Sequence, residues 1–544
     1  MHNSARLRLI LLAAGGLLAQ FAPTPVPVQE PELDLSPRFL QSIHSCARCH
    51  NPSSDAEALH AIDGSDASPV GTFNGTVMQS AFIDPYYRAQ LAHEASFLPA
   101  EQASELESDC LRCHAPLVAF ERQLAQQPPA NLAQTLLDGR ASEGVSCTAC
   151  HRIGPDGLGD EATFDGHPPL SLDARLFGPY PEPFTGPMLN MTGYEVTYGP
   201  HMVGSSLCGT CHTLRTHPSS GADPFLEQSP YLEWRNSDFS YEQGATEKSR
   251  SCQACHMTDV GSMKIAHAPS GFDFAFLEDR PEVRTHGIVG GNAMLLDLLA
   301  ANGEELGALA STADYERLAV KTRQQLGGQT VSLEVEAGES SPDTIEFNVV
   351  VGNRAGHRLP TGYPSRRMWL EVQVEGPNGV WFASGVPDEE GRILPKAEAF
   401  SMPHLNQITE AQQVQIWERV AVNSAGAPTT RVATMARSLK DNRLLPLGWS
   451  ADGPHAERTG PVGVGDDPDF LGGEDRVAFS LTLPESQAGK QTVEVRVLFQ
   501  TMPPAWTDPF AEGKSEAERR FTRMLAEAPT RYEVLAEGRV RIGG

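Results

Sequence analysis

Five copies of one short motif, Cys-x-x-Cys-His, constrain this 544-residue chain more than any other feature. The copies begin at Cys46, Cys110, Cys147, Cys208 and Cys252. In each copy two thiols are separated by two residues, so both can reach the two vinyl groups of one porphyrin and form thioethers. The histidine that follows then lies under the ring, with an imidazole nitrogen on the iron. The motif spacing therefore predicts five covalently attached c-type haems.

The cysteine count agrees with this interpretation, because the five motifs use all ten cysteines of the chain. The residues predicted to bond the porphyrins are Cys46, Cys49, Cys110, Cys113, Cys147, Cys150, Cys208, Cys211, Cys252 and Cys255. The predicted proximal iron ligands are His50, His114, His151, His212 and His256. Redox disulfides, zinc sites and secreted disulfide frameworks also use paired cysteines. None of these alternatives explains a histidine directly after every pair.

The N-terminal residues have the pattern of an export signal. In residues 1–22, Arg6 and Arg8 precede an apolar run, and small residues follow it. The run is too short for a comfortable membrane span, and no other long apolar stretch occurs, so we do not expect an integral membrane protein after signal cleavage. Residues 23–37 are rich in proline and acid and are expected to form a linker. The predicted location is the periplasm or the outside of the cell, including its surface.

The charge balance bears on the partners of the chain. The formal net charge is −27, which argues against nucleic acid as a partner. An acidic surface favours redox partner proteins with basic patches, such as other cytochromes or quinol-linked proteins. It would equally keep an exported protein soluble. The sequence leaves the oligomeric state open, and an oligomer is compatible with it.

Each iron also needs a second axial ligand, and two imidazoles give a low-spin haem suited to electron transfer. Eleven histidines remain after the motif histidines and His2 are set aside. From their sequence context, the candidate distal ligands are His44, His93, His201, His286 and His357. The other six, which have weaker contexts, are His60, His167, His217, His267, His404 and His455. Met78 is a further possibility, with a buried packing role as its alternative.

Two domains are expected after the linker. Residues 38–326 hold all five motifs and are predicted to form a mostly α-helical and irregular cytochrome domain, in which the porphyrins supply much of the buried apolar surface. Helical spacing of apolar residues predicts helices near 293–299 and 315–326. Residues 327–544 show period-two apolar runs separated by Gly, Pro and Asp turns, which predict an antiparallel β-sandwich. The predicted fold class is therefore multidomain α + β.

One basic loop lies between two predicted strands, over residues 352–367. If His357 ligates an iron, this loop is where the sandwich docks on the cytochrome domain. Alternatively, Arg358, Arg366 and Arg367 could pair with haem propionates, or the loop could be a solvated turn.

The haem region resembles multihaem cytochromes of the cytochrome c554 type. The stretches that carry the resemblance are residues 84–87, 144–146, 199–201, 206–208, 228–234, 356–362 and 441–443. The resemblance implies bis-histidine haems packed closely together, and it strengthens His201 and His286 as distal ligands. Ammonia-forming nitrite reductases of the same superfamily carry a Cys-x-x-Cys-Lys motif, which is absent here.

Three functions remain open at this stage. The first is an exported electron carrier with five mostly bis-His haems, which needs no catalytic residues. The second is a haem oxidoreductase that acts on a small nitrogen or sulfur compound at one open iron. The third is a structural subunit of a haem filament or of a surface electron-transfer complex. We favour the electron carrier over an enzyme, chiefly because of the resemblance to multihaem cytochromes, and the sequence offers no convincing catalytic residues.

Overall fold

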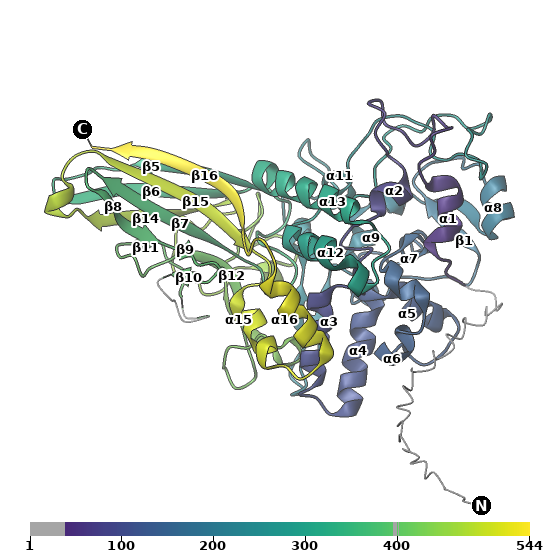
Figure 1. Ribbon diagram of the computed structural model, residues 1–544, viewed down its shortest axis with the longest axis horizontal. Coiled ribbons are helices and arrows are strands. Elements are labelled where there is room, and N and C mark those ends of the chain that lie inside the picture. The colour runs from purple at the N-terminus through teal and green to yellow at the C-terminus, as the bar shows by residue number, and fades with distance from the viewer. Residues whose placement is uncertain (1–38, 395–399, 401, 544) are drawn as a thin grey trace, which may run out of the picture. The chain divides into compact units, whose positions relative to one another are not determined.

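The computed structural model describes residues 39–394, 400 and 402–543 (Figure 1). The predicted signal segment 1–22 and linker 23–37 lie outside the described residues. The described residues from Phe39 onward form one compact unit. Its helices and mainly antiparallel sheets give a mixed α + β fold, which confirms the predicted class. Within the described residues, no helix combines the length and apolar character needed to cross a bilayer.

Short helices joined by long turns build the part that carries the five motifs. These helices are α1 (Ile43–His50), α2 (Pro69–Phe73), α3 (Pro85–Ala95), α4 (Ala100–His114), α5 (Pro116–Leu124), α6 (Leu132–Thr135), α7 (Cys147–His151), α8 (Gly186–Thr192), α9 (Ser205–Gly209), α10 (Pro230–Arg235) and α11 (Cys252–His256). Local sequence explains the start of α3, because the carboxylate of Asp84 caps its first amides and Pro85 occupies the first helical position. Two small sheets complete this part: β1 (Arg175–Gly178) pairs with β2 (Glu195–Tyr198), and β3 (Leu214–Thr216) pairs with β4 (Phe225–Gln228).

The two helices predicted near the end of this part are present as α12 (Ala293–Leu306) and α13 (Thr312–Gln325). Asn292 caps α12, and a capping box between Ser311 and Asp314 begins α13. Their buried faces join α3, α4 and α5 in one hydrophobic core. These helices lie beside the motif helices in Figure 1.

The remaining described chain forms two large sheets that share a core, and a small two-stranded antiparallel sheet of Val386–Pro387 and Ile393–Leu394. The strands are β5 (Val331–Ala337), β6 (Thr344–Asn353), β7 (Arg367–Gly376), β8 (Gly379–Ser384), β9 (Val386–Pro387), β10 (Ile393–Leu394), β11 (Gln407–Ile408), β12 (Ile416–Val422), β13 (Arg437–Asp441), β14 (Glu474–Thr482), β15 (Gln491–Gln500) and β16 (Glu533–Ile542). One sheet has the order β11-β14-β6-β5, and the other has β13-β12-β7-β15-β16, with β8 on β7. Alternate residues of β6 and β14 in the first sheet, and Val493, Val495 and Val497 of β15 in the second, are buried, and Phe347 of β6 stacks on Phe479 of β14. The short β11–β14 pair is parallel, which the prediction of an antiparallel sandwich did not include.

A helix inserted between the last two strands connects the sheets to the motif helices. Helix α16 (Glu516–Ala526) begins with a capping box between Ser515 and Glu518 and packs against α3. Phe521 of α16 is fully buried against Tyr86 of α3, with ring centroids 5.4 Å apart. The sheets therefore share a packed interface with the part that carries the motifs.

Candidate functional site

All five motifs lie at the ends of helices, and four of them end a helix at their histidine. The first, second, third and fifth motifs end α1, α4, α7 and α11, and the fourth begins in α9. A helical turn places the second thiol of each motif and the following histidine on adjacent positions near the helix end. The structure therefore presents each motif as a compact set of two thiols and one imidazole. All ten thiols are free of disulfide bonds.

One large cavity joins the five motifs. Its volume is about 2130 Å³, whereas a pocket for one small ligand has roughly 300–1,000 Å³. The ten motif cysteines and the five motif histidines all line it. The remaining lining is largely apolar, with side chains such as Val70, Phe73 and Leu207. The residues and the space therefore fit several porphyrins in contact with one another.

For four of the five motif histidines, a hydrogen bond determines which ring nitrogen is left free to bind a metal. The Nδ1–H groups of His50, His114, His151 and His256 donate to the carbonyls of Ile265, Ala81, Phe177 and Val289, at 2.9, 2.8, 2.7 and 2.6 Å respectively. A histidine that donates through Nδ1 keeps the lone pair of Nε2 for a metal. Burial lowers the pKa of His114 and of His212 to about 4, so that both are neutral at physiological pH. The four imidazoles that donate to backbone carbonyls are therefore oriented as proximal iron ligands would be.

Two predicted distal histidines face motif histidines. The rings of His151 and His286 have centroids 6.3 Å apart and planes 26° apart. The rings of His256 and His357 have centroids 6.3 Å apart and planes 14° apart. An iron about 2 Å from one nitrogen of each ring would place the centroids roughly 6 Å apart. The structure thus brings two histidine pairs to the separation that a shared haem iron requires.

In the pair formed by His256 and His357, hydrogen bonds define the tautomer of both rings. The Nδ1–H of His357 donates to the carbonyl of Arg358 at 2.9 Å, and that of His256 donates to Val289. Each ring consequently has its Nε2 free. Burial lowers the pKa of His357, and it lowers that of His286 to about 3, which keeps both rings neutral.

Sulfur atoms of different motifs also lie together. The thiols of three pairs of cysteines lie close enough to shift one another's pKa: Cys46 with Cys147, Cys113 with Cys211, and Cys208 with Cys252. The first motif therefore lies beside the third, the second beside the fourth, and the fourth beside the fifth. Cys150 is also within electrostatic range of Cys211, which places the third motif near the fourth.

The other three predicted distal histidines do not line the cavity. His44 is exposed on α1. The Nδ1–H of His93 donates to Glu518 of α16 at 2.9 Å, and its ring packs against Phe510. The Nε2 of His201 lies 2.9 Å from the carbonyl of Ile153, and its buried Nδ1 has no partner.

The cavity lining includes residues that sequence reasoning ranked low or did not consider. His167, His217 and Met78 all line it. The ring of Tyr87 stacks on that of His114, with centroids 3.6 Å apart. These residues lie in turns and loops or on α3, and no periodic pattern marks them.

A buried ion network holds the loop that carries His357. Arg358 is fully buried and pairs with Asp441 at 2.6 Å, and Arg443 pairs with the same carboxylate at 2.7 Å. Arg443 also lies 3.3 Å from Glu233 of α10, and the amide of Arg358 donates to Glu233 at 3.1 Å. Two guanidinium groups hold the pKa of Asp441 well below its usual range. The network joins the sheet region to a helix that lies between the fourth and fifth motifs in the sequence.

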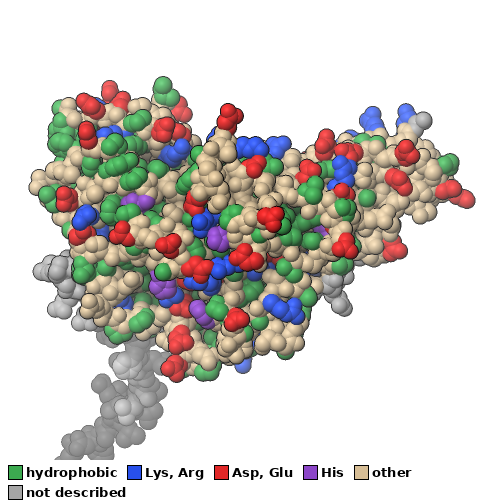
Figure 2. All heavy atoms as spheres, turned by 180° about the vertical axis from the view of Figure 1, so that it is seen from behind, with side chains coloured by type: hydrophobic (Ala, Val, Ile, Leu, Met, Phe, Trp, Pro, Cys, Tyr) green, Lys and Arg blue, Asp and Glu red, His purple; other side chains and the backbone are tan. Residues whose placement is uncertain are grey.

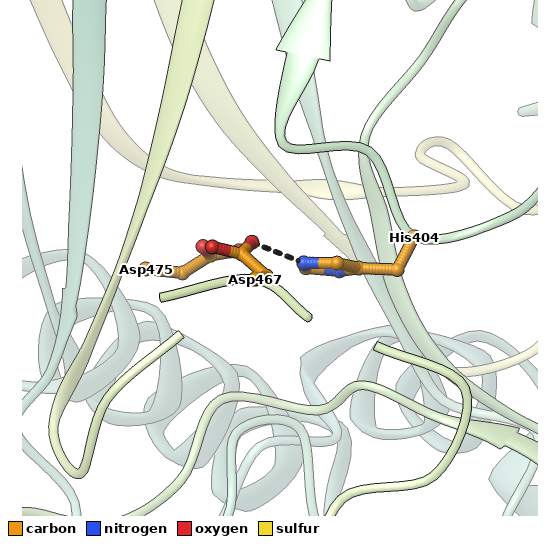
Figure 3. Close-up of side chains that lie close together, drawn as sticks. All are labelled: His404, Asp467 and Asp475. Carbon is orange, nitrogen blue, oxygen red and sulfur yellow. Dashed lines mark hydrogen bonds and ion pairs between the residues drawn. The ribbon is translucent and has the colours of Figure 1, made fainter. Parts of the chain in front are cut away.

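A separate polar group lies within the sheet region. His404, Asp467 and Asp475 bring their ligand atoms within 4.8 Å of one another (Figure 3). The side-chain amides of Gln415 and Asn442 both approach Nδ1 of His404, at 2.8 and 3.1 Å. Because both amides present donors, the ring proton is on Nε2, which donates to Asp467 at 2.8 Å. As arranged, the group is a hydrogen-bond network, in which the Nε2 proton of His404 lies between the ring and Asp467.

Asp475 completes that network. Its Oδ2 accepts from the indole of Trp417 at 2.7 Å, whereas its Oδ1 is buried without a partner. Burial, with the nearby Asp467 carboxylate, raises the pKa of Asp475 to about 7. The carboxyl group of Asp475 therefore holds a proton mainly below about pH 7.

The surface differs between the two parts of the chain. Figure 2 shows apolar side chains gathered over the motif part, with histidine side chains visible among acidic and basic ones. Phe184, Phe272 and Phe276 are 52%, 59% and 51% exposed, and the rings of Phe184 and Phe276 lie 4.4 Å apart. Because Phe184 also lines the cavity, this apolar patch lies beside the cavity rim.

Comparisons with known proteins inform the fold. No family model matches the sequence, and no curated protein matches it. Among solved structures, a penta-heme cytochrome c552 from Thermochromatium tepidum aligns with a TM-score of 0.52 and 16% sequence identity. The alignment covers 93% of this chain and 99% of that chain. The chain therefore has a fold similar to that of a multihaem cytochrome.

Proposed function

We propose that this chain is an exported c-type cytochrome of the cytochrome c554 type that carries electrons through five covalently bound haems. One observation carries the proposal: the five Cys-x-x-Cys-His motifs all line one cavity, and two motif histidines already face a second imidazole at 6.3 Å. Haem c would supply one-electron redox chemistry there. The motif cysteines would hold each porphyrin, and the motif histidines would hold each iron.

The neighbouring thiols of different motifs would place the bound haems along one connected path for electrons. The first and third motifs lie together, and the fourth motif lies close to the second, third and fifth. Haems bound at these positions would form one continuous chain with a branch at the fourth haem. His286 would then hold the iron of the third haem together with His151, and His357 would hold that of the fifth together with His256.

The redox partner, in this proposal, is another exported electron-transfer protein. The net charge of −27 favours a partner with a basic surface, and we expect the encounter rate to fall with ionic strength. The export pattern of residues 1–22 supports a location in the periplasm or at the cell surface. Mass spectrometry of the mature protein from each cell fraction tests both cleavage and location.

The decisive experiment combines haem counting with electron paramagnetic resonance. Pyridine haemochrome analysis should give five haems per chain, and the oxidised protein should show mostly low-spin iron by spin integration. Fewer than five covalent haems in a fully matured preparation would overturn the proposed stoichiometry. A preparation with five high-spin irons would overturn the proposed electron carrier.

A second candidate function has one observation in its favour. His151 and His256 each face a second imidazole ring at about 6 Å. Within the described part of the chain, His50, His114 and His212 have no such partner ring. An iron left with an open position could bind a small nitrogen or sulfur compound, as in a haem oxidoreductase. Addition of nitrite, hydroxylamine or sulfite should then shift a high-spin signal. Spectra that none of the three compounds changes would exclude this function for them.

A further inference from the structure

Three phenylalanine rings form an apolar patch on the surface of the motif part, which we call the phenylalanine patch. The rings of Phe184 and Phe276 lie 4.4 Å apart, and those of Phe274 and Phe276 lie 5.0 Å apart. Phe184 and Phe276 each expose half of their surface. Burial of an aromatic ring is favourable, so adjoining rings that are left in water indicate a surface that another molecule covers.

Two separate segments of the chain build the phenylalanine patch, and a guanidinium group holds them together. One ring comes from residues 180–189, and the other two come from residues 272–284. Arg280 of the second segment donates to the carbonyls of Pro181 and Glu182 in the first, at 3.2 and 3.0 Å. The patch is therefore arranged before a partner arrives, which lowers the entropic cost of binding.

Residues just before each segment orient the histidines of the first and third motifs. The carbonyl of Ile265, shortly before the second segment, accepts the Nδ1–H of His50 at 2.9 Å. The carbonyl of Phe177, shortly before the first segment, accepts the Nδ1–H of His151 at 2.7 Å. The segments that form the phenylalanine patch thus continue directly from the backbone that holds these two motifs.

The phenylalanine patch reaches the cavity at one end of the proposed haem path. Phe184 and Phe274 line the cavity. The thiol of Cys46 in the first motif lies beside that of Cys147 in the third, so the first haem would be an end of the path. Helix α8, which follows Phe184 in the sequence, lies at the edge of the motif part away from the sheets (Figure 1). Because electrons pass between proteins only where their redox centres come close, a partner has to dock near such an end.

Acidic side chains surround the phenylalanine patch in the sequence. The exposed charged residues of the two segments are all carboxylates: Glu182, Glu278, Asp279 and Glu282. The two arginines of the second segment are partly buried, and Arg284 pairs with Asp259 at 3.7 Å. An apolar centre with an acidic rim is complementary to a partner that has an apolar centre and a basic rim. A second copy of this chain, with its net charge of −27, would instead bring like charges together.

We propose that the phenylalanine patch is the surface on which a basic electron-transfer protein docks to exchange one electron with the first haem. The proposal rests on the haem-binding function above, and it adds the place and the kind of the partner. In the exchange, the metal centre of one protein is oxidised and that of the other is reduced. Complexes of electron-transfer proteins are weak and small, so three rings with a charged rim suffice for such an encounter.

The test uses the haem-loaded full chain, with a small basic monohaem cytochrome c as the probe. Isothermal titration calorimetry with both proteins oxidised measures binding without electron transfer. Stopped-flow mixing of the reduced chain with the oxidised probe then measures the rate of exchange. Haem content is determined first for every preparation. A wild type without covalent haems would defeat the proposed function, whereas this inference is decided by the comparison of haem-loaded variants.

The apolar centre is tested with Phe276→Ser. Phe276 does not line the cavity, so this substitution leaves the surroundings of the haems in place. Affinity and exchange rate should both fall roughly threefold or more at every ionic strength, because salt does not screen the loss of an apolar contact. Val380→Ser is the control, since Val380 is 55% exposed on β8 of the sheet region.

The acidic rim is tested with the double variant Glu182→Gln, Asp279→Asn. Neither residue lines the cavity. Affinity and exchange rate should fall at low ionic strength, and the difference from the wild type should disappear at high ionic strength. The matched control is Glu339→Gln, Asp343→Asn, which removes the same charge from exposed residues between β5 and β6.

The inference is supported if both patch variants weaken binding and slow exchange while both controls keep the wild-type values. It is overturned if the patch variants behave as the wild type does, or if a wild type with five haems does not bind the probe. Equal losses in the rim variant and its control would also overturn it, because net charge alone would then guide the partner. Analytical ultracentrifugation covers one more occupant: a wild-type dimer that Phe276→Ser dissociates would assign the patch to a second copy and overturn the inference.

Discussion

The imidazoles of His256 and His357 face one another with ring centroids 6.3 Å apart, although one ends a motif helix and the other lies in a loop between two sheet strands. Both rings donate their Nδ1–H groups to backbone carbonyls, so both Nε2 atoms are free to bind one iron. With the proposed haem bound at the fifth motif, His357 of the sheet region would hold its iron opposite His256.

This relationship predicts the effect of His357→Ala. Loss of the distal imidazole should leave the fifth haem with one axial ligand and convert one haem equivalent from low spin to high spin. Electron paramagnetic resonance with spin integration measures the change. His60→Ala is the control, because His60 does not line the cavity and its Nδ1 lies 3.1 Å from the carbonyl of Ala58. An unchanged spectrum in His357→Ala would remove His357 from the ligand set.

His286→Ala should change a different haem. The ring of His286 faces His151 rather than His256, so the high-spin equivalent should belong to the third haem. Effects at separate irons should add, and the double variant with His357→Ala should contain two high-spin equivalents. If the double variant contained only one high-spin equivalent, the two histidines would be ligands of the same iron.

Sequence patterns predicted the motifs, helices α12 and α13, and the main strands, because each depends on local spacing. They could not predict which histidine meets which motif. His357 reaches the fifth motif through the docking of its loop, where Arg443 pairs with Glu233 of α10. His93 lies on a helix as expected, but the packing of α16 on α3 places its Nδ1 beside Glu518. Such outcomes depend on contacts between residues far apart in the sequence.

The docking network itself is expected to be essential for stability. Asp441→Asn would leave Arg358 and Arg443 buried with only Glu233 as a carboxylate. Removal of one partner from a buried ion network costs roughly 3–5 kcal/mol of unfolding free energy. Chemical denaturation followed by circular dichroism measures the loss.

The matched control for that prediction is Asp508→Asn. Asp508 pairs with Arg392 at 2.8 Å, and their side chains are 52% and 34% exposed. An exposed pair contributes less than about 1 kcal/mol. Equal losses in the two variants would contradict a structural role for the Asp441 network.

The last prediction concerns pH and the carboxyl group of Asp475. Its pKa is raised from 3.8 to about 7 in the folded protein, because the group is buried beside the Asp467 carboxylate. Between these two values the folded state holds a proton that the unfolded state releases, so the stabilising contribution is full below about pH 4 and declines as the pH rises through 7. Asp475→Asn keeps a neutral side chain of similar size and should remove this decline. We expect the variant to gain stability relative to the wild type as the pH rises from 5 to about 8.

Unfolding midpoints measured across that pH range test the prediction. Asp466→Asn is the control, because Asp466 is exposed in the same loop as Asp467. Parallel pH profiles for the wild type and Asp475→Asn would show that Asp475 is not the titrating group. A gain for Asp475→Asn that grows with pH, and is absent from the control, would support an Asp475 carboxyl group that is neutral in the folded protein at low pH and titrates near pH 7. Loss of stability in Asp475→Asn at every pH would instead show that the carboxyl group is ionised in the folded protein and accepts a hydrogen bond that the amide cannot replace.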